Sequence, residues 1–348
     1  MHARRRIRTS PIIGIAVALG AASVCARPGP AEKPAAPPPP AAADDRPGQR
    51  VGLPDGRRLN FRCAGRGSPT VVFEGGYAAS SLAWVRVQPA IAKLTRACSY
   101  DRAGYGFSDM GPPPRDGVAV AKDLDDALRA ADIKGPFVMV GHSAGALYVR
   151  IFADRRPKDV VGMVLVEPSV AHEDDRLAAV AGPGAGSLAA IRARPARCLA
   201  AAEAGDIIAD PEFADCVAAP PSGGDVIAQI TKDEDAWRTE ISELDTLWTT
   251  TSDEVDAGRK SYGDMPLVVL TADGTYADAP EPLRSTITSA WIRLHQEIAA
   301  LSTRGSEQLV RRSSHMMIFD RPDAIVSAIE KVVTAARAAT GSRPSAAS

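Results

Sequence analysis

The sequence carries almost no net charge. Its 348 residues include 41 Lys and Arg against 42 Asp and Glu, which gives a formal charge of −1 with histidine neutral. A protein that attracts nucleic acid through its overall field carries a clear excess of basic residues. The balance argues against nucleic acid as a partner.

Long apolar runs are missing as well. The apolar stretch 12–22 follows four arginines within the first eight residues and is too short for a membrane span. Together with the small residues before Ala26, this order is typical of an export signal. We therefore expect residues 1–26 to be cleaved, the mature protein to have no stable membrane span, and its location to be secreted or periplasmic. Lipid attachment at Cys25 is a lesser alternative, because Val24 is bulkier than such sites prefer.

The sequence has no cluster of cysteine and histidine that would hold a metal, and the chemistry inferred below needs no cofactor. Of its five cysteines, four remain after cleavage. An even number in an oxidising compartment favours disulfide bonds over free thiols. We favour Cys63 with Cys98, which would tie two early strands together, and Cys198 with Cys216, which would close a short loop.

The composition divides the chain into a core and two ends. Proline and alanine dominate residues 27–50, which lack the apolar content to pack and are expected to form a disordered linker. Residues 339–348 are expected to form a disordered tail. One domain is predicted over 51–338.

Within this domain, strand-like and helix-like segments alternate, which predicts an α/β fold with a mainly parallel sheet covered on both faces. The expected strands are 57–63, 70–73, 97–100, 137–140, 160–166 and 267–270. A closing helix is expected from Pro322, with apolar residues at helical spacing over 325–333. The stretch from about 170 to 263 interrupts the alternation and is predicted to be an inserted helical lid. Its residues Trp237, Ile241, Leu244 and Trp248 would form one apolar helix face.

A glycine-serine motif carries the strongest chemical signal. Residues 141–145 read Gly-His-Ser-Ala-Gly and stand between the apolar run 137–140 and a helix-forming stretch. At such a turn from strand to helix, the serine hydroxyl is held above the sheet edge. The flanking glycines let strand and helix approach closely. We predict Ser143 as a nucleophile rather than a serine in an ordinary turn.

A serine nucleophile needs a base, and the sequence offers only five histidines. His2 would leave with the signal, and His142, next to the nucleophile, is expected to point away. His172 comes too early in the chain for this role. His295 falls inside a helix-like run, whereas His315 lies in a loop ahead of the last helix, where it can reach the nucleophile. We predict His315 as the general base.

The imidazole must be oriented by a carboxylate, which also stabilises its positive charge. Asp273, shortly after the strand 267–270, is the first choice. Glu167, at the end of the strand 160–166, is an alternative, because a carboxylate there can reach the same imidazole. Asp278 is a second alternative.

Acyl transfer also needs N–H donors for the oxyanion that forms on the attacked carbonyl. One is expected from the backbone of Ala144, directly after the nucleophile. The other is expected from the loop Glu74-Gly75-Gly76-Tyr77, where glycine lets the backbone come close to the substrate. Gly76 is the first choice in this loop and Tyr77 the next.

Four segments together resemble the α/β-hydrolase superfamily over about residues 51–338. They are Phe73-Glu74-Gly75-Gly76, the run Tyr100-Asp101-Arg102-Ala103-Gly104-Tyr105-Gly106-Phe107-Ser108-Asp109, Gly141–Gly145, and His315 followed by Asp320-Arg321-Pro322-Asp323. The resemblance implies an α/β-hydrolase fold. In relatives the second segment mostly shapes the loop beside the site, so Asp101 and Asp109 are not expected to be catalytic. The chain departs from many relatives in carrying Glu74 where they have histidine.

The residues and the resemblance predict a serine hydrolase that cleaves small-molecule carboxylic esters through an acyl-enzyme. Dehalogenases and epoxide hydrolases of similar fold use aspartate at the nucleophile position, so Ser143 argues against those reactions. One alternative is an aminopeptidase that resembles proline iminopeptidases, in which lid carboxylates such as Glu240 or Glu243 would bind the substrate's ammonium group. Another is a catalytically inactive binding protein on the same fold.

Overall fold

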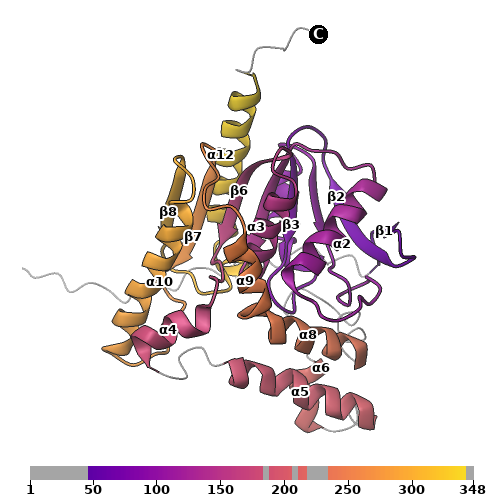
Figure 1. Cartoon of the computed structure of the whole chain (residues 1–348), viewed down its shortest axis with the longest axis vertical. Helices are drawn as coiled ribbons and strands as arrows, with labels where there is room; N and C mark the ends of the chain where they lie inside the picture. Colours follow the sequence, from indigo (N-terminus) through magenta and orange to yellow (C-terminus); the bar gives the residue numbers. More distant parts are fainter. Residues whose placement is uncertain (1–45, 183–187, 206–210, 218–233, 342–348) are drawn as a thin grey trace, which may run out of the picture. The chain divides into compact units, whose positions relative to one another are not determined.

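The computed structural model describes residues 46–182, 188–205, 211–217 and 234–341 (Figure 1). The expected signal and most of the expected linker lie outside the described residues. At the centre of the described part is an eight-stranded sheet with the order β1-β2-β4-β3-β5-β6-β7-β8. The pairs β1–β2 and β2–β4 are antiparallel, and all other neighbours are parallel. This is the predicted α/β-hydrolase architecture.

Six of these strands follow the apolar runs of the sequence, and β1 and β8 were not predicted. The strands are β1 (Gln49–Gly52), β2 (Arg58–Ala64), β3 (Thr70–Glu74), β4 (Ala97–Tyr100), β5 (Phe137–His142), β6 (Val160–Val166), β7 (Leu267–Ala272) and β8 (Gly305–Val310). Because β1 begins at Gln49, the end of the predicted linker already belongs to the sheet.

Two apolar cores lie on the two faces of the sheet. In β5, Val138 and Val140 pack in one core, and Phe137 and Met139 pack in the other, as expected for side chains that alternate along a strand. The first core includes α1 (Gln88–Ile91) and α12 (Pro322–Gly341), and the second includes α2 (Gly117–Ala130), α3 (Gly145–Arg155) and α10 (Leu283–Ala299). The sheet is thus covered on both sides (Figure 1).

The closing helix α12 begins at the expected proline. Ile325, Ile329, Val332 and Val333 are at most 1% exposed, so the predicted apolar stripe packs on the sheet. The helix continues to Gly341, which means that the first residues of the predicted tail are helical.

The described residues of the predicted lid region form mainly helices between β6 and β7. They are α4 (Glu173–Ala181), α5 (Leu188–Ala204), η2 (Pro211–Phe213), α6 (Ala214–Val217), α8 (Glu234–Leu247) and α9 (Thr250–Ala257). Trp237 and Leu244 of α8 and the following Trp248 are buried, whereas Ile241 is half-buried. The expected apolar face is therefore present, and α8 packs against α5.

Both favoured cysteine pairs are bonded. Cys63–Cys98 joins β2 to β4 at directly opposed positions of the sheet. Cys198–Cys216 joins α5 to α6, and both cysteines pack near Trp237. In the part of the chain that the structure describes, no helix has the length and apolar character needed to cross a membrane.

Candidate active site

Ser143 occupies the sharp turn between β5 and α3. Its φ is +52°, and its N–H donates to the carbonyl of Val166 at 3.1 Å. A Cβ at Gly141 would lie 2.7 Å from the carbonyl oxygen of Gly145, and one at Gly145 would lie 2.5 Å from that of Gly75. Backbone atoms cannot move aside as a flexible side chain can, so the turn needs both glycines of the motif.

His315 comes from the loop between β8 and α11 (Met317–Asp320). Its Nε2 lies 3.0 Å from Oγ of Ser143, which is hydrogen-bond distance. Burial lowers the pKa of His315, so the imidazole is neutral at pH 7 and can accept a proton. The structure thus brings together two side chains that are 172 residues apart in the sequence.

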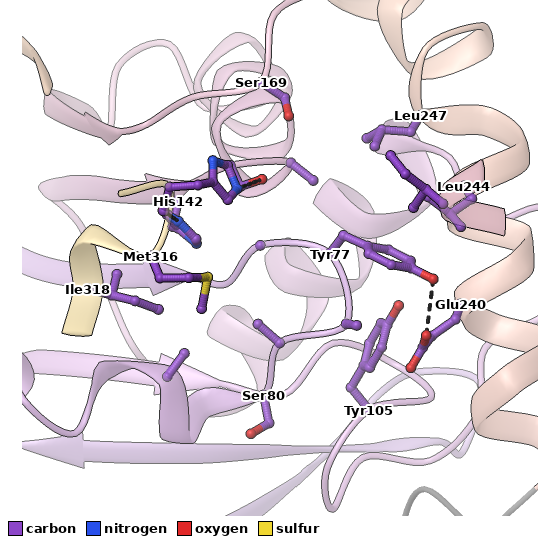
Figure 2. Close-up of a pocket in the computed structure, with 18 of the residues that line it drawn as sticks. Tyr77, Ser80, Tyr105, His142, Ser169, Glu240, Leu244, Leu247, Met316 and Ile318 are labelled. Atoms are coloured by element: carbon purple, nitrogen blue, oxygen red, sulfur yellow. Dashed lines mark hydrogen bonds between the residues drawn. The ribbon is translucent and has the colours of Figure 1, made fainter. Parts of the chain in front are cut away.

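The sequence predicts that the side chain of His142 points away from the site, and the structure shows that this prediction is wrong. Its ring lines the same cavity as Ser143, and its Nε2 lies 2.9 Å from the carbonyl oxygen of His315 (Figure 2). Burial lowers the pKa of His142 to about 3, so the ring is neutral at pH 7. Because the carbonyl can only accept, Nε2 carries the proton and donates it. His142 therefore fastens the loop that carries His315.

The other two histidines within the described ranges are bonded to residues other than Ser143. His295 is fully buried, with Nδ1 2.9 Å from Oγ1 of Thr271 and Nε2 2.9 Å from the carbonyl oxygen of Pro168. Burial lowers its pKa to about 3. His172 pairs with Asp256 at 3.1 Å. Both are accounted for by structural contacts.

The three candidate acids lie in different environments. Oδ1 of Asp273 accepts a hydrogen bond from the backbone N–H of Ser313 at 3.2 Å, two residues before His315. Asp278 is exposed. Across the described ranges, no carboxylate forms a hydrogen bond with the ring of His315 itself. The structure therefore places Asp273 on the loop that carries His315 and not on the imidazole of His315.

Glu167 is held by partners of its own. It is fully buried, and its carboxylate accepts hydrogen bonds from Trp291 Nε1 at 2.7 Å and from Thr275 Oγ1 at 3.0 Å. The backbone N–H of Ala272 lies 3.3 Å from the same group. Burial raises the pKa of Glu167 to about 8. These contacts hold the carboxylate between β6, β7 and α10.

The predicted oxyanion donors lie next to the serine. A Cβ at Gly76 would be 3.2 Å from Cβ of Ser143 and 3.0 Å from Nδ1 of His142, so the loop after β3 passes close to Ser143. Gly76, Tyr77 and Ala144 all line the cavity. Among described residues, their backbone N–H groups have no acceptor, which leaves these donors available to a ligand.

A cavity of about 520 Å³ adjoins Ser143 and His315, and both residues line it. Its wall is mainly apolar, and includes Leu82, Trp237, Leu244, Leu247, Trp248, Met316, Ile318 and Phe319. Figure 2 shows Leu244 and Leu247 of the lid on one side and Met316 and Ile318 on the other. A cavity of this kind suits an apolar small molecule.

Glu240 is the buried lid carboxylate in this wall. It is 5% exposed, and its Oε2 accepts a hydrogen bond from Tyr77 at 3.0 Å (Figure 2). No described residue donates to its Oε1. Burial raises the pKa of Glu240 to about 7. Glu243, one turn further along α8, does not line the cavity and is bonded to Arg102 and Tyr105.

Comparisons with known proteins agree with this architecture. The sequence model of the alpha/beta hydrolase family matches residues 71–328. The uncharacterized protein YqjL of Bacillus subtilis is 37% identical over 106 residues, which are 30% of this chain and 42% of that protein. An AB hydrolase superfamily protein of Gibberella zeae is 35% identical over 103 residues, which are 28% of this chain and 32% of that protein. The match thus spans less than half of each relative.

Among solved structures, a loop variant of a haloalkane dehalogenase from Bradyrhizobium elkanii superposes with a TM-score of 0.61 at 18% identity. The superposition covers 85% of this chain and 99% of that chain. At this level of identity the likeness concerns the fold alone.

Proposed function

Since this chain belongs to the alpha/beta hydrolase family, we propose that it is a serine hydrolase that cleaves carboxylic esters through an acyl-enzyme. The observation that carries the proposal is the 3.0 Å contact between Oγ of Ser143 and Nε2 of His315 at the wall of an apolar cavity. A nucleophile and a base within hydrogen-bond reach are the minimum apparatus for this reaction.

In the first half of the reaction, Ser143 Oγ bonds to the carbonyl carbon of the ester while its proton passes to Nε2 of His315. The negative oxygen accepts hydrogen bonds from the N–H groups of Gly76 and Ala144. The C–O bond to the alcohol then breaks, and the leaving oxygen takes the proton from His315. In the second half, water attacks the acyl-serine with His315 as the base, which releases the acid and restores the serine.

We propose Asp273 as the acid that orients the base. Of the three candidates it is the one bonded to the loop of His315, through the N–H of Ser313. Glu167 accepts hydrogen bonds from other donors. Burial raises its pKa to about 8, so the carboxyl is mostly protonated at pH 7 and is less suited to stabilise a positively charged imidazole. Asp278 is exposed.

The two disulfide bonds support a location in an oxidising compartment, such as the periplasm or the exterior of the cell. Disulfide bonds are rare in proteins kept in a reducing cytosol. Measuring the protein in cell fractions, beside a cytosolic and a periplasmic marker, tests this part of the proposal.

A second candidate function is an aminopeptidase. The observation in its favour is Glu240, whose Oε1 lies at the cavity, receives no hydrogen bond from a described residue and could accept one from a substrate ammonium group. Glu243 is not suited to that role, because both its oxygens are bonded to Arg102. Cleavage of aminoacyl-arylamides in preference to simple esters would favour this function.

Labelling with a fluorophosphonate tests the proposal directly. The wild-type protein should react at Ser143, and Ser143→Ala should abolish both the label and the hydrolysis of a panel of esters, lactones and arylamides. Ser80→Ala is a matched control, because Ser80 lines the same cavity without contacting His315. Label that persists in Ser143→Ala would refute the site, and a wild-type protein that never reacts would favour an inactive binding protein.

A further inference from the structure

Arg102 is a buried cation beside the oxyanion loop, which we define as residues 74–77. It follows β4 and is 2% exposed. Nη1 donates to the carbonyl of Gly75 at 2.8 Å, and Nη2 donates to the carbonyl of Gly76 at 2.8 Å. A single planar guanidinium thus donates hydrogen bonds to the carbonyls of two successive peptide groups of the loop.

The guanidinium is also held by two carboxylates from different parts of the fold. Nη1 donates to Glu74 at 2.8 Å, and Nε and Nη2 donate to the two oxygens of Glu243 at 2.8 and 3.1 Å. Together with the two carbonyls, these contacts engage all five N–H groups of the arginine. The hydroxyl of Tyr105 donates to Glu243 at 2.9 Å, and that of Tyr100 donates to Glu74.

The two hydrogen bonds from Arg102 to the loop carbonyls also determine the direction of the neighbouring N–H groups. In a planar trans peptide the C=O of one residue and the N–H of the next point in opposite directions. With the carbonyls of Gly75 and Gly76 turned toward Arg102, the N–H groups of Gly76 and Tyr77 face away from it. In the described part of the chain these two N–H groups have no acceptor, and Gly76 lies against Ser143.

We propose that Arg102 is a positioning residue of the active site. It fixes the peptide planes of the oxyanion loop so that their N–H groups face the carbonyl bound at Ser143, and α8 of the lid holds the arginine in place through Glu243. The proposal rests on the proposed hydrolase function. Lysine cannot replace this arginine fully, because an ammonium group has three donors and no planar fork.

The experiment compares Arg102→Lys with the wild type in ester hydrolysis and in binding of a trifluoromethyl ketone, whose adduct with a serine carries an oxyanion. We expect kcat to fall roughly 10- to 100-fold, a part of what the loss of a whole oxyanion donor costs, with KM changed less than about threefold. Affinity for the ketone should fall by a similar factor. The acid limb of the pH profile, which reports His315, should stay in place.

Arg115→Lys is the matched control, because Arg115 is also 2% exposed and bonded to a carboxylate, Asp123, but does not contact the oxyanion loop. If Arg102→Lys fails to fold, Glu243→Gln keeps the arginine and its contact with Glu74, and should give a smaller loss of the same kind. Unchanged kcat, a loss of kcat without loss of ketone affinity, or an equal loss in Arg115→Lys would overturn the proposal. A wild type that neither turns over an ester nor takes the fluorophosphonate label would instead overturn the hydrolase function on which it rests.

Discussion

The hydroxyl of Tyr77 donates a hydrogen bond to Oε2 of Glu240 at 3.0 Å, which joins the loop after β3 to the lid helix α8. Burial raises the pKa of Glu240 to about 7, against a usual value of 4.5. The carboxyl is therefore mostly protonated at pH 6 and mostly charged at pH 8. The charge on this wall of the cavity is thus set by pH.

We predict from this contact that cationic substrates bind better as the pH rises through 7. KM for an ester with an ammonium group should fall roughly tenfold between pH 6 and pH 8, because the newly charged carboxylate attracts the cation. A neutral ester of equal length is the control, and its KM should stay nearly constant. The pH dependence should disappear in Glu240→Gln, and its persistence there would assign it to another group.

A second prediction concerns Asp273, which we propose as the acid of the triad. Asp273→Asn should lower kcat by on the order of 10²- to 10⁴-fold, because an uncharged partner no longer stabilises the imidazolium. Asp278→Asn and Glu167→Gln should each lower kcat less than about tenfold. Steady-state kinetics on one ester ranks the three variants, with circular dichroism to check folding. A larger loss of kcat in Glu167→Gln than in Asp273→Asn would assign the role of the acid to Glu167, at the end of β6.

The close approach of Gly76 to Ser143 gives a third prediction. Alanine here would bring a methyl group to 3.0 Å from Nδ1 of His142 and 3.2 Å from Cβ of Ser143, both tighter than ordinary contacts. Gly76→Ala should therefore lower kcat by roughly tenfold or more, since small misplacement of the reacting groups is costly. Gly52→Ala is the control, because nothing lies within 4 Å of its added Cβ. Equal activity in the two variants would mean that the loop 74–77 shifts to accommodate the added methyl group without loss of function.

Acid stability is the subject of a fourth prediction. Burial lowers the pKa of His295 to about 3, whereas in the unfolded chain it is close to 6.5. Below pH 6.5 the unfolded chain binds a proton that the folded protein does not, so folding stability falls as the pH is lowered toward 3. The slope from this group is about 1.4 kcal/mol per pH unit.

Urea unfolding between pH 6 and pH 4 measures this effect. His295→Gln should have a shallower loss of stability with acid than the wild type, by about the slope of one histidine. Gln296→Ala changes an exposed neighbour that does not titrate and should leave the slope unchanged. Parallel curves for His295→Gln and the wild type would contradict the lowered pKa.

Elements with an apolar signature were predictable from the sequence. Val160–Val166 and Ala97–Tyr100 were expected with the correct bounds, because strands buried on both faces are mainly apolar in sequence. Gly305–Val310 was missed, since only its last residue is buried and its sequence GSEQLV shows no apolar run. An edge strand with one neighbour needs little apolar surface, so its pattern is weak.

Contacts between distant segments were harder to predict. The sequence motif and the loop ahead of the last helix predicted that Ser143 and His315 lie together, and the structure confirms that contact. The partnership of Arg102 with Glu243 joins residues 141 positions apart, and no local pattern reports it. The direction of the His142 ring was wrongly predicted, because it depends on where the loop of His315 lies.

The helix α8 lines the cavity with Trp237, Leu244 and Leu247 and bonds to Arg102 with Glu243. The positions of α8 should therefore differ in how well they tolerate substitution when substrate preference changes. Exchanges at 244 or 247 would change the shape of the cavity without touching Ser143 or His315. If Arg102 positions the oxyanion loop as we propose, an exchange at 243 would lower the turnover of every substrate alike. Directed evolution for altered selectivity should therefore accumulate changes at 244 and 247 and leave Glu243 in place.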